Sequence, residues 1–152
     1  MAENFTMTLI VDQSPREVFN AVLNVRGWWH GFYSEEIIGE MRNENDEFTF
    51  RAGDGAHFTR QKLVNVIADK RVEWLVTESA LTFIEDEGEW EGTRLVFEIS
   101  QKAGKTQLVF THHGLTPEVE CYDACSGAWT MYLREKLLSL IEAASPQEQP
   151  QQ

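Results

Sequence analysis

The residue types that could do chemistry gather in the last third of the chain. His112 and His113 are followed closely by Cys121, Cys125 and Ser126. A cysteine or serine acts as a covalent nucleophile when a histidine base lies within about 3 Å and a third group orients that base. The spacing permits such proximity, but the sequence has no Gly-x-Ser-x-Gly elbow and no glycine loop of the phosphate-binding kind. We therefore expect no catalytic residue, and lean toward a protein that is not an enzyme.

Two cysteines and two histidines also raise the question of a metal site. Adjacent residues on a strand point to opposite faces, so His112 and His113 cannot both turn toward one ion. On a helix of 3.6 residues per turn, Cys121 falls about 40° outside the apolar stripe that contains Cys125. These four side chains should not converge. We expect no metal and no cofactor, and His112 keeps three possible roles: a structural histidine, a ligand contact, or an acid or base.

Composition limits the partners that the protein can have. The chain has 152 residues, which suits one domain, and a formal net charge of -12. Such a surface repels phosphate backbones and anionic lipid headgroups, so nucleic acid and membrane surfaces are poor partners. No window approaches the roughly 18 apolar residues of a membrane span, and the N-terminus lacks the basic start of a signal peptide. We expect a cytoplasmic protein whose two cysteines remain thiols.

Local patterns predict the order of elements. Phe5 to Val11 alternates in polarity as a half-buried strand does. Ser14-Pro15-Arg16-Glu17 has the capping serine, first-turn proline and glutamate of a capping box, so a helix should follow. The segment from Trp28 to Tyr33 is short and broken by glycine. About six antiparallel strands are expected between Ile37 and Gly114, and one long helix from Pro117 to Ala144.

These elements predict an α+β fold in which the last helix covers one face of an antiparallel sheet. Residues 1–144 should form this single domain, and the polar, proline-containing residues 145–152 a disordered tail. Strand parity turns His112 inward and His113 toward solvent. The acidic run from Glu85 to Glu91 reads as a solvated loop, with a site for a cation or a basic protein as the alternative. The helix stripe should consist of Val119, Tyr122, Cys125, Ser126, Trp129, Leu133, Leu137, Leu140 and Ile141.

Order and local motifs together resemble a known superfamily. The strand before Ser14-Pro15-Arg16-Glu17-Val18-Phe19, the tryptophan pair, the run from Glu89 to Ile99 and the helix around Ala128-Trp129 are similar to the helix-grip domains called SRPBCC. These include START, birch-pollen-allergen and polyketide-cyclase types. Within it, the chain resembles the branch related to the C-terminal domain of the heat-shock-protein-90 ATPase activator. The resemblance implies a curved sheet that grips the last helix, with a cavity between them.

Aromatic side chains dominate the positions that should face this space. They could simply fill the core, but bulky rings on a concave sheet under one helix pack poorly at the centre. Trp28, Trp29 and Phe32 could either plug the end of the sheet or form a lid over a ligand entrance. His57 or Arg60 could add a polar contact. The candidate ligand-binding residues are Trp28, Trp29, Phe32, Phe48, Phe50, Trp74, Phe97, Phe110, His112, Tyr122, Cys125, Ser126 and Trp129.

Three functions fit these expectations. The favoured one is a binding protein for a small hydrophobic or amphipathic ligand, lipid-like or aromatic, held between sheet and helix. The second is a chaperone partner that resembles the ATPase activator domain. The third is a cyclase or dehydratase like those of polyketide pathways, which would need titratable groups inside the cavity. The protein could be a monomer or a homodimer in each case. Fold alone cannot choose among them.

Overall fold

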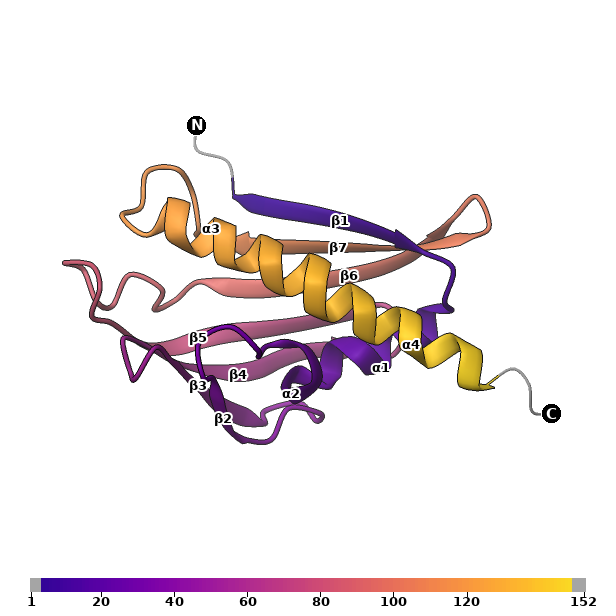
Figure 1. Cartoon of the computed structure of the whole chain (residues 1–152), viewed down its shortest axis with the longest axis horizontal. Coiled ribbons are helices and arrows are strands. Elements are labelled where there is room, and N and C mark those ends of the chain that lie inside the picture. Colours follow the sequence, from indigo (N-terminus) through magenta and orange to yellow (C-terminus); the bar gives the residue numbers. More distant parts are fainter. Residues whose placement is uncertain (1–3, 149–152) are drawn as a thin grey trace.

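The computed structural model describes residues 4–148 of the chain, and the side chains of residues 4–143. One curved, unclosed sheet wraps around a long C-terminal helix, as expected of a helix-grip fold (Figure 1). The elements run in the order β1 (Phe5–Val11), α1 (Pro15–Leu23), α2 (Val25–Trp28), β2 (Glu36–Gly39), β3 (Glu47–Ala52), β4 (His57–Ile67), β5 (Arg71–Leu81), β6 (Arg94–Lys102), β7 (Lys105–His113), α3 (Tyr122–Met131), η1 (Tyr132–Leu137) and α4 (Leu138–Glu148).

The sheet has seven strands in the order β1-β7-β6-β5-β4-β3-β2, and every neighbouring pair is antiparallel. Strands β2 to β7 follow one another as hairpins, which confirms the predicted run of about six. Strand β1 instead pairs with β7, so β1 and β2 form opposite edges of the sheet. The chain between them must cross the width of the sheet, and it does so through α1 and α2.

The start of α1 follows from its sequence. The hydroxyl of Ser14 accepts a hydrogen bond from the backbone N–H of Glu17 at 3.1 Å, and the Glu17 carboxylate accepts one from the N–H of Ser14 at 2.9 Å. This reciprocal capping box satisfies two N–H groups that the first helical turn leaves free. Pro15 occupies the first turn without losing a hydrogen bond. The predicted helix start is therefore confirmed.

The C-terminal helix begins later than the sequence predicts. Its first regular turn starts at Tyr122, and residues 117–121 form turns that lead into it. Six residues in the middle, η1, have the wider π-helical winding, which places the consecutive residues Tyr132 and Leu133 both on the buried face. Helix α4 continues to Glu148, past the predicted boundary at Ala144. The rest of the predicted tail, residues 149–152, lies outside the described residues.

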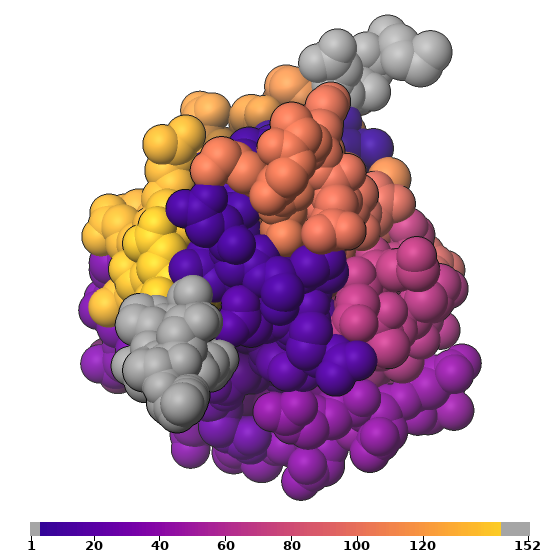
Figure 2. Space-filling view, turned by 90° about the vertical axis from the view of Figure 1, so that its right-hand side faces the viewer, coloured from indigo at the N-terminus to yellow at the C-terminus, as the bar shows by residue number. Residues whose placement is uncertain are grey.

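The core lies between the concave face of the sheet and the helices. Strand parity is confirmed at its centre: Trp74, Phe97, Phe110 and His112 are all at most 1% exposed. At one end of the molecule the N-terminal part of the chain, drawn in indigo, fills the space between yellow α4 and the orange β6–β7 turn (Figure 2). The buried face of α1, which contains Val18, Phe19 and Val22, packs into this end.

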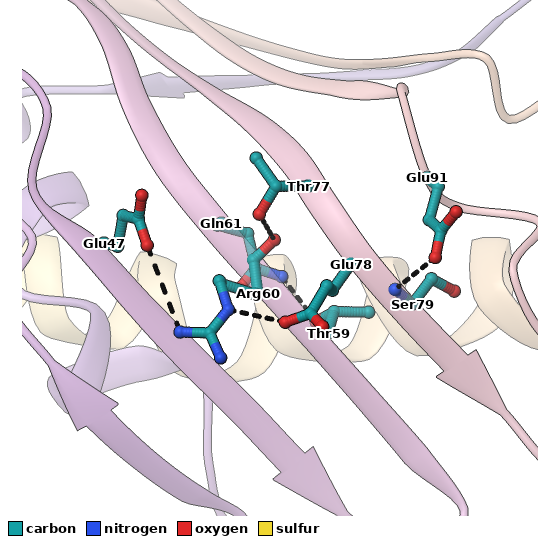
Figure 3. A network of polar contacts seen from close by, with 8 residues as sticks. All are labelled: Glu47, Thr59, Arg60, Gln61, Thr77, Glu78, Ser79 and Glu91. Carbon is teal, nitrogen blue, oxygen red and sulfur yellow. Dashed lines mark hydrogen bonds and ion pairs between the residues drawn. The ribbon is translucent and has the colours of Figure 1, made fainter.

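The outer face of the sheet is polar. Arg60 donates to Glu78 at 2.6 Å and lies 4.0 Å from Glu47, across three neighbouring strands (Figure 3). Thr59 and Gln61, its neighbours along β4, point to the opposite face, where both are fully buried. Arg60 therefore serves the outer surface and does not reach the space beneath the helix.

Candidate ligand-binding pocket

A pocket of about 280 Å³ lies beneath α3, at the end of the molecule opposite to α1. It is bounded by β3, the start of β4, the loop after β5, and the inner face of α3 and η1. Its lining is formed by Trp29, Tyr33, Phe50, Ala52, Gly53, Ala56, His57, Phe83, Trp90, Ala124, Cys125, Ala128, Trp129 and Tyr132.

Stacked aromatic rings form the inner wall of the pocket. Trp29 stacks on Phe50 with ring centroids 3.9 Å apart, and on Trp129 at 5.1 Å. Trp90 stacks on the same Trp129 at 6.0 Å. Trp29 and Trp129 are nearly fully buried, so this wall is part of the core as well as of the pocket. A wall built from mutually packed rings is rigid, because no ring can turn without displacing its neighbours.

Exposed residues mark the mouth of the pocket. Tyr33 and Phe83 are 47% and 46% exposed, and Gly53 and Ala124 are also exposed. They come from the loop before β2, the β3–β4 turn, the loop after β5, and α3. The small side chains of Ala124 and Ala128 on the helix leave room that larger residues would fill, so the pocket opens to solvent at this end.

Three large side chains of the wall donate their polar hydrogens to partners among their protein neighbours. Trp129 Nε1 donates to His112 Nδ1 at 3.1 Å, and Trp90 Nε1 donates to Cys121 Sγ at 3.4 Å. The hydroxyl of Tyr132 donates to Glu35 Oε2 at 2.5 Å. These bonds fix the rings and leave mainly apolar surface facing the pocket.

His112 is a satisfied structural histidine. Its Nδ1 accepts from Trp129, and its Nε2 lies 2.9 Å from Thr93 Oγ1. Thr93 donates its own hydroxyl hydrogen to the carbonyl of Trp90 at 2.6 Å, so Nε2 is the protonated nitrogen of a neutral imidazole. Burial, with smaller contributions from His57 and His113, lowers the pKa of His112 to about 3.

The two cysteines lie at the start of α3, and both are free and buried. Hydrogen bonds from the thiol of Cys125 and from the indole of Trp90 lower the pKa of Cys121, although burial opposes this. The Cys121 sulfur and burial together raise the pKa of Cys125, the one that lines the pocket. Cys125 therefore presents a protonated thiol to the pocket.

A carboxylate organises the loop that forms one side of the mouth. Glu35 accepts hydrogen bonds from the backbone N–H groups of Gly31, Phe32 and Tyr33 at 2.8 to 3.2 Å, besides the one from Tyr132. Partial burial raises the pKa of Glu35, but these hydrogen bonds outweigh it and lower the pKa overall. Glu35 thus ties the loop before β2 to η1.

The acidic loop is more than a solvated segment. The Glu89 carboxylate accepts from the backbone N–H groups of Glu120 and Cys121 at 2.7 and 3.0 Å, where α3 starts. In return, Glu120 accepts from the N–H groups of Glu85 and Asp86. These contacts hold the loop against the helix and direct Trp90, which is 3% exposed, into the pocket wall.

The predicted site residues divide between the pocket and the core around it. Trp29, Phe50, Cys125 and Trp129 line the pocket. Trp28, Phe48, Trp74, Phe97, Phe110 and His112 are buried elsewhere in the core, whereas Phe32, Tyr122 and Ser126 are half-buried outside the lining. The tryptophan pair also divides: the Trp28 indole donates to Val22 O at 3.1 Å within the core, whereas Trp29 faces the pocket. Their roles in binding stay predictions.

Trp90 and Tyr132 line the pocket without having been predicted to do so. A signal for Trp90 does exist in the sequence, because a large aromatic among five acidic residues is out of place in a solvated loop. Tyr132 depends on the π-helical winding of η1, which regular helix periodicity does not reveal. Small residues such as Ala52 and Ala56 carry no comparable signal.

Similarity to known proteins agrees with this architecture. Residues 12–142 match the family model described as Activator of Hsp90 ATPase homolog 1-like protein. The chain belongs to this family. No curated protein sequence matches it. The family assignment confirms the resemblance seen in the strand, capping box and final helix, and places the pocket in a fold of the SRPBCC superfamily.

Solved structures of other members of this fold superpose over most of the chain. The Aha1 dimer from Colwellia psychrerythraea, solved in solution, has a TM-score of 0.67 at 21% identity and covers 93% of this chain and 95% of its own. Protein CV1439 from Chromobacterium violaceum has a TM-score of 0.67 at 15% identity, covering 91% and 97%. CalU16 from Micromonospora echinospora has a TM-score of 0.60 at 18% identity, covering 96% and 78%.

Two further features concern partners. In the part of the chain that the structure describes, no helix combines the length and apolar character needed to cross a membrane. Within the same residues, no group of three or more histidine, cysteine and acidic side chains is arranged to hold a metal ion.

Proposed function

We propose that this member of the Hsp90 ATPase activator-like family binds a small apolar molecule, aromatic or lipid-like, in the pocket beneath α3. The observation that carries the proposal is the lining itself. The chain has 38 acidic and basic residues, yet no aspartate, glutamate, lysine or arginine is among the described residues that line the pocket. Ligand sites are typically concave and mostly apolar, with few polar groups.

The size of the pocket supports a ligand with more than one ring. Its volume of about 280 Å³ is nearly twice that of a 150 Å³ cavity that holds benzene. Burial of such a ligand contributes about 25 cal/mol per Å² of apolar surface. The rigid aromatic wall needs little reordering on binding, which favours affinity because less entropy is lost.

Filling the pocket tests the proposal. Ala128 lines it from α3, whereas Ala143 lies exposed on α4, away from the pocket. The wild-type protein should enhance the fluorescence of the neutral probe N-phenylnaphthylamine. Ala128→Phe should weaken this binding at least about tenfold, because the phenyl ring occupies ligand volume, and Ala143→Phe should leave it unchanged. Equal binding by both variants would place the probe elsewhere. Organic extraction followed by mass spectrometry would identify a ligand that co-purifies.

A second candidate function is contact with a chaperone ATPase, which the description of the matching family favours. A surface contact would not need the pocket. If this function holds, the protein should change the ATPase rate of an Hsp90-class chaperone, and Ala128→Phe should do so equally. The Colwellia relative is described as a dimer, and sedimentation equilibrium would show whether this chain is one too.

The third class expected from the sequence, a cyclase or dehydratase, needs titratable groups inside the cavity, and His112 and Tyr122 are two of the predicted site residues that could have supplied them. Neither residue lines the pocket, and both nitrogens of His112 already have hydrogen-bond partners. We therefore do not propose that activity through these residues.

A further inference from the structure

His57 lines the pocket with a buried ring nitrogen that has no hydrogen-bond partner among the described residues. It begins β4, opposite Ala52 of β3 and Leu81 of β5. The residue is half-buried and lines the pocket, and its Nε2 is buried without a hydrogen-bond partner. Trp90, Trp129 and Tyr132 in the same wall, by contrast, all have partners.

Three aromatic rings hold the imidazole in place. Phe50 and Trp90 lie perpendicular to it, with centroids 5.2 and 4.8 Å away, and Phe83 stacks on it at 6.3 Å. None of these rings offers an oxygen or nitrogen to accept a hydrogen bond from the imidazole in this geometry. A polar group enclosed in this way has lost its hydrogen bonds to water without gaining a partner, so it destabilises the fold relative to a paired group. An apolar side chain at this position would avoid that cost.

The protonation state of His57 limits which functional group of a ligand can bind to it. Burial lowers its pKa to about 4, so the imidazole is neutral near pH 7 and offers one N–H and one lone pair. A carboxylate brought beside it would be desolvated without a compensating charge, which is costly. A hydroxyl group avoids that penalty, and it can either donate to the lone pair or accept from the N–H.

We propose that His57 is the residue that selects and orients the ligand, and that this ligand is an aromatic molecule with a neutral hydroxyl group, such as a phenol. The inference rests on the proposed function, since it requires a ligand in the pocket. The apolar body of the molecule would lie along Trp29, Phe50 and Trp129. The hydroxyl group would hydrogen-bond to the imidazole at the β4 side of the pocket, once the exposed Phe83 ring that stacks on His57 moves aside and uncovers Nε2.

Matched probes test this selection. Naphthol and methylnaphthalene have nearly the same shape but differ in the hydroxyl group, and naphthoate replaces that group with a carboxylate. Isothermal titration of the wild-type protein should show naphthol binding roughly tenfold more tightly than either of the others, in keeping with one hydrogen bond to an otherwise unpaired group. Equal binding of naphthol and methylnaphthalene, or tighter binding of naphthoate, would overturn the inference.

Variants assign the effect to His57. His57→Phe should bind naphthol and methylnaphthalene equally, His57→Gln should restore part of the preference for naphthol, and the exposed control His113→Phe should keep all of it. A preference that survives in His57→Phe would overturn the inference. In the wild-type protein, the imidazole nitrogen NMR signals of His57 should shift with naphthol and not with methylnaphthalene, a readout independent of whether the variants fold. An absence of this difference would also contradict the role.

These results separate the inference from the proposed function. If methylnaphthalene and N-phenylnaphthylamine both bind in the pocket but naphthol gains nothing, only the role of His57 fails. If Ala128→Phe weakens the binding of none of these probes, the proposed function fails, and the inference fails with it.

Discussion

Trp129 of α3 donates its indole hydrogen to Nδ1 of His112 on β7, across 3.1 Å, in the buried centre of the protein. This bond joins the last helix to the sheet at the inner wall of the pocket. It satisfies two polar atoms that would otherwise be buried without partners, and it holds the ring on which Trp29 and Trp90 stack.

Removal of this ring should therefore destabilise the protein strongly. Trp129→Ala leaves a cavity and an unpaired His112 nitrogen, so we expect a loss of about 3 to 5 kcal/mol in the free energy of unfolding, measured with urea. Phe83→Ala, at the exposed rim of the same pocket, is the control and should cost much less. A loss below about 1 kcal/mol for Trp129→Ala would contradict the burial of the ring.

Lowering the pH should reduce the free energy of unfolding because two histidines are buried in their neutral form. The folded-state pKa values of His57 and His112, about 4 and about 3, lie below the ordinary 6.5, so the unfolded chain binds more protons between these values. Their stabilising contribution is complete above about pH 6.5 and is lost as the pH falls. Between pH 7.5 and 5.5 we expect a loss of about 1.4 kcal/mol for each histidine. Urea unfolding at both pH values measures it. His57→Phe should remove about half of the pH effect.

The Glu35 carboxylate should matter more than its partial exposure suggests. Glu35→Gln replaces one acceptor oxygen with an amide donor that faces backbone N–H groups, and we expect a loss of about 1 to 2 kcal/mol in stability. The neighbouring Glu36 is exposed, so Glu36→Gln serves as its control. Thermal unfolding followed by circular dichroism would compare them, and equal melting temperatures would refute the role of Glu35 in anchoring the loop.

Glu89 should stabilise the start of α3. Glu89→Gln weakens the charge-assisted acceptor of the Glu120 and Cys121 N–H groups, for which we expect a cost of about 1 kcal/mol. Glu87→Gln changes the same charge in the same loop, and serves as the matched control. Hydrogen exchange of the Glu120 and Cys121 amides should accelerate in the Glu89 variant only; unchanged exchange would speak against the contact.

Alanine substitutions at two glycines should have opposite effects on the stability of the protein. Gly127 lies in α3, and an added Cβ meets nothing within 4 Å, so Gly127→Ala should stabilise the protein by about 0.5 to 1 kcal/mol. Gly114 has a φ of 108°, and its added Cβ would lie 2.5 Å from Thr93 Cγ2, so Gly114→Ala should destabilise. Denaturant midpoints would reveal both, and a destabilised Gly127→Ala would contradict the open surroundings of that position.

The sequence by itself determines those features that depend on local periodicity and capping. The alternation of β1, the capping box of Ser14 and Glu17, and the inward and outward parity of His112 and His113 are all confirmed. Each depends on residues within a few positions of one another, where the periods of strand and helix govern the outcome. Together they predicted the α+β class with the last helix covering one face of the sheet, whereas the curved grip of the sheet on that helix was implied by the family resemblance.

Only the tertiary structure decides which of the inward residues surround the pocket. Trp90 lies in the pocket wall because the Glu89 carboxylate accepts a hydrogen bond from the backbone N–H of Glu120, 31 positions further along the chain. Tyr132 lies there because the helix has the wider π-helical winding at η1. The direction of His57 depends on β4, whose pairing with β5 shifts register twice, so parity could not be extended along it. Such features arise from contacts between distant segments, so local sequence periodicity cannot predict them.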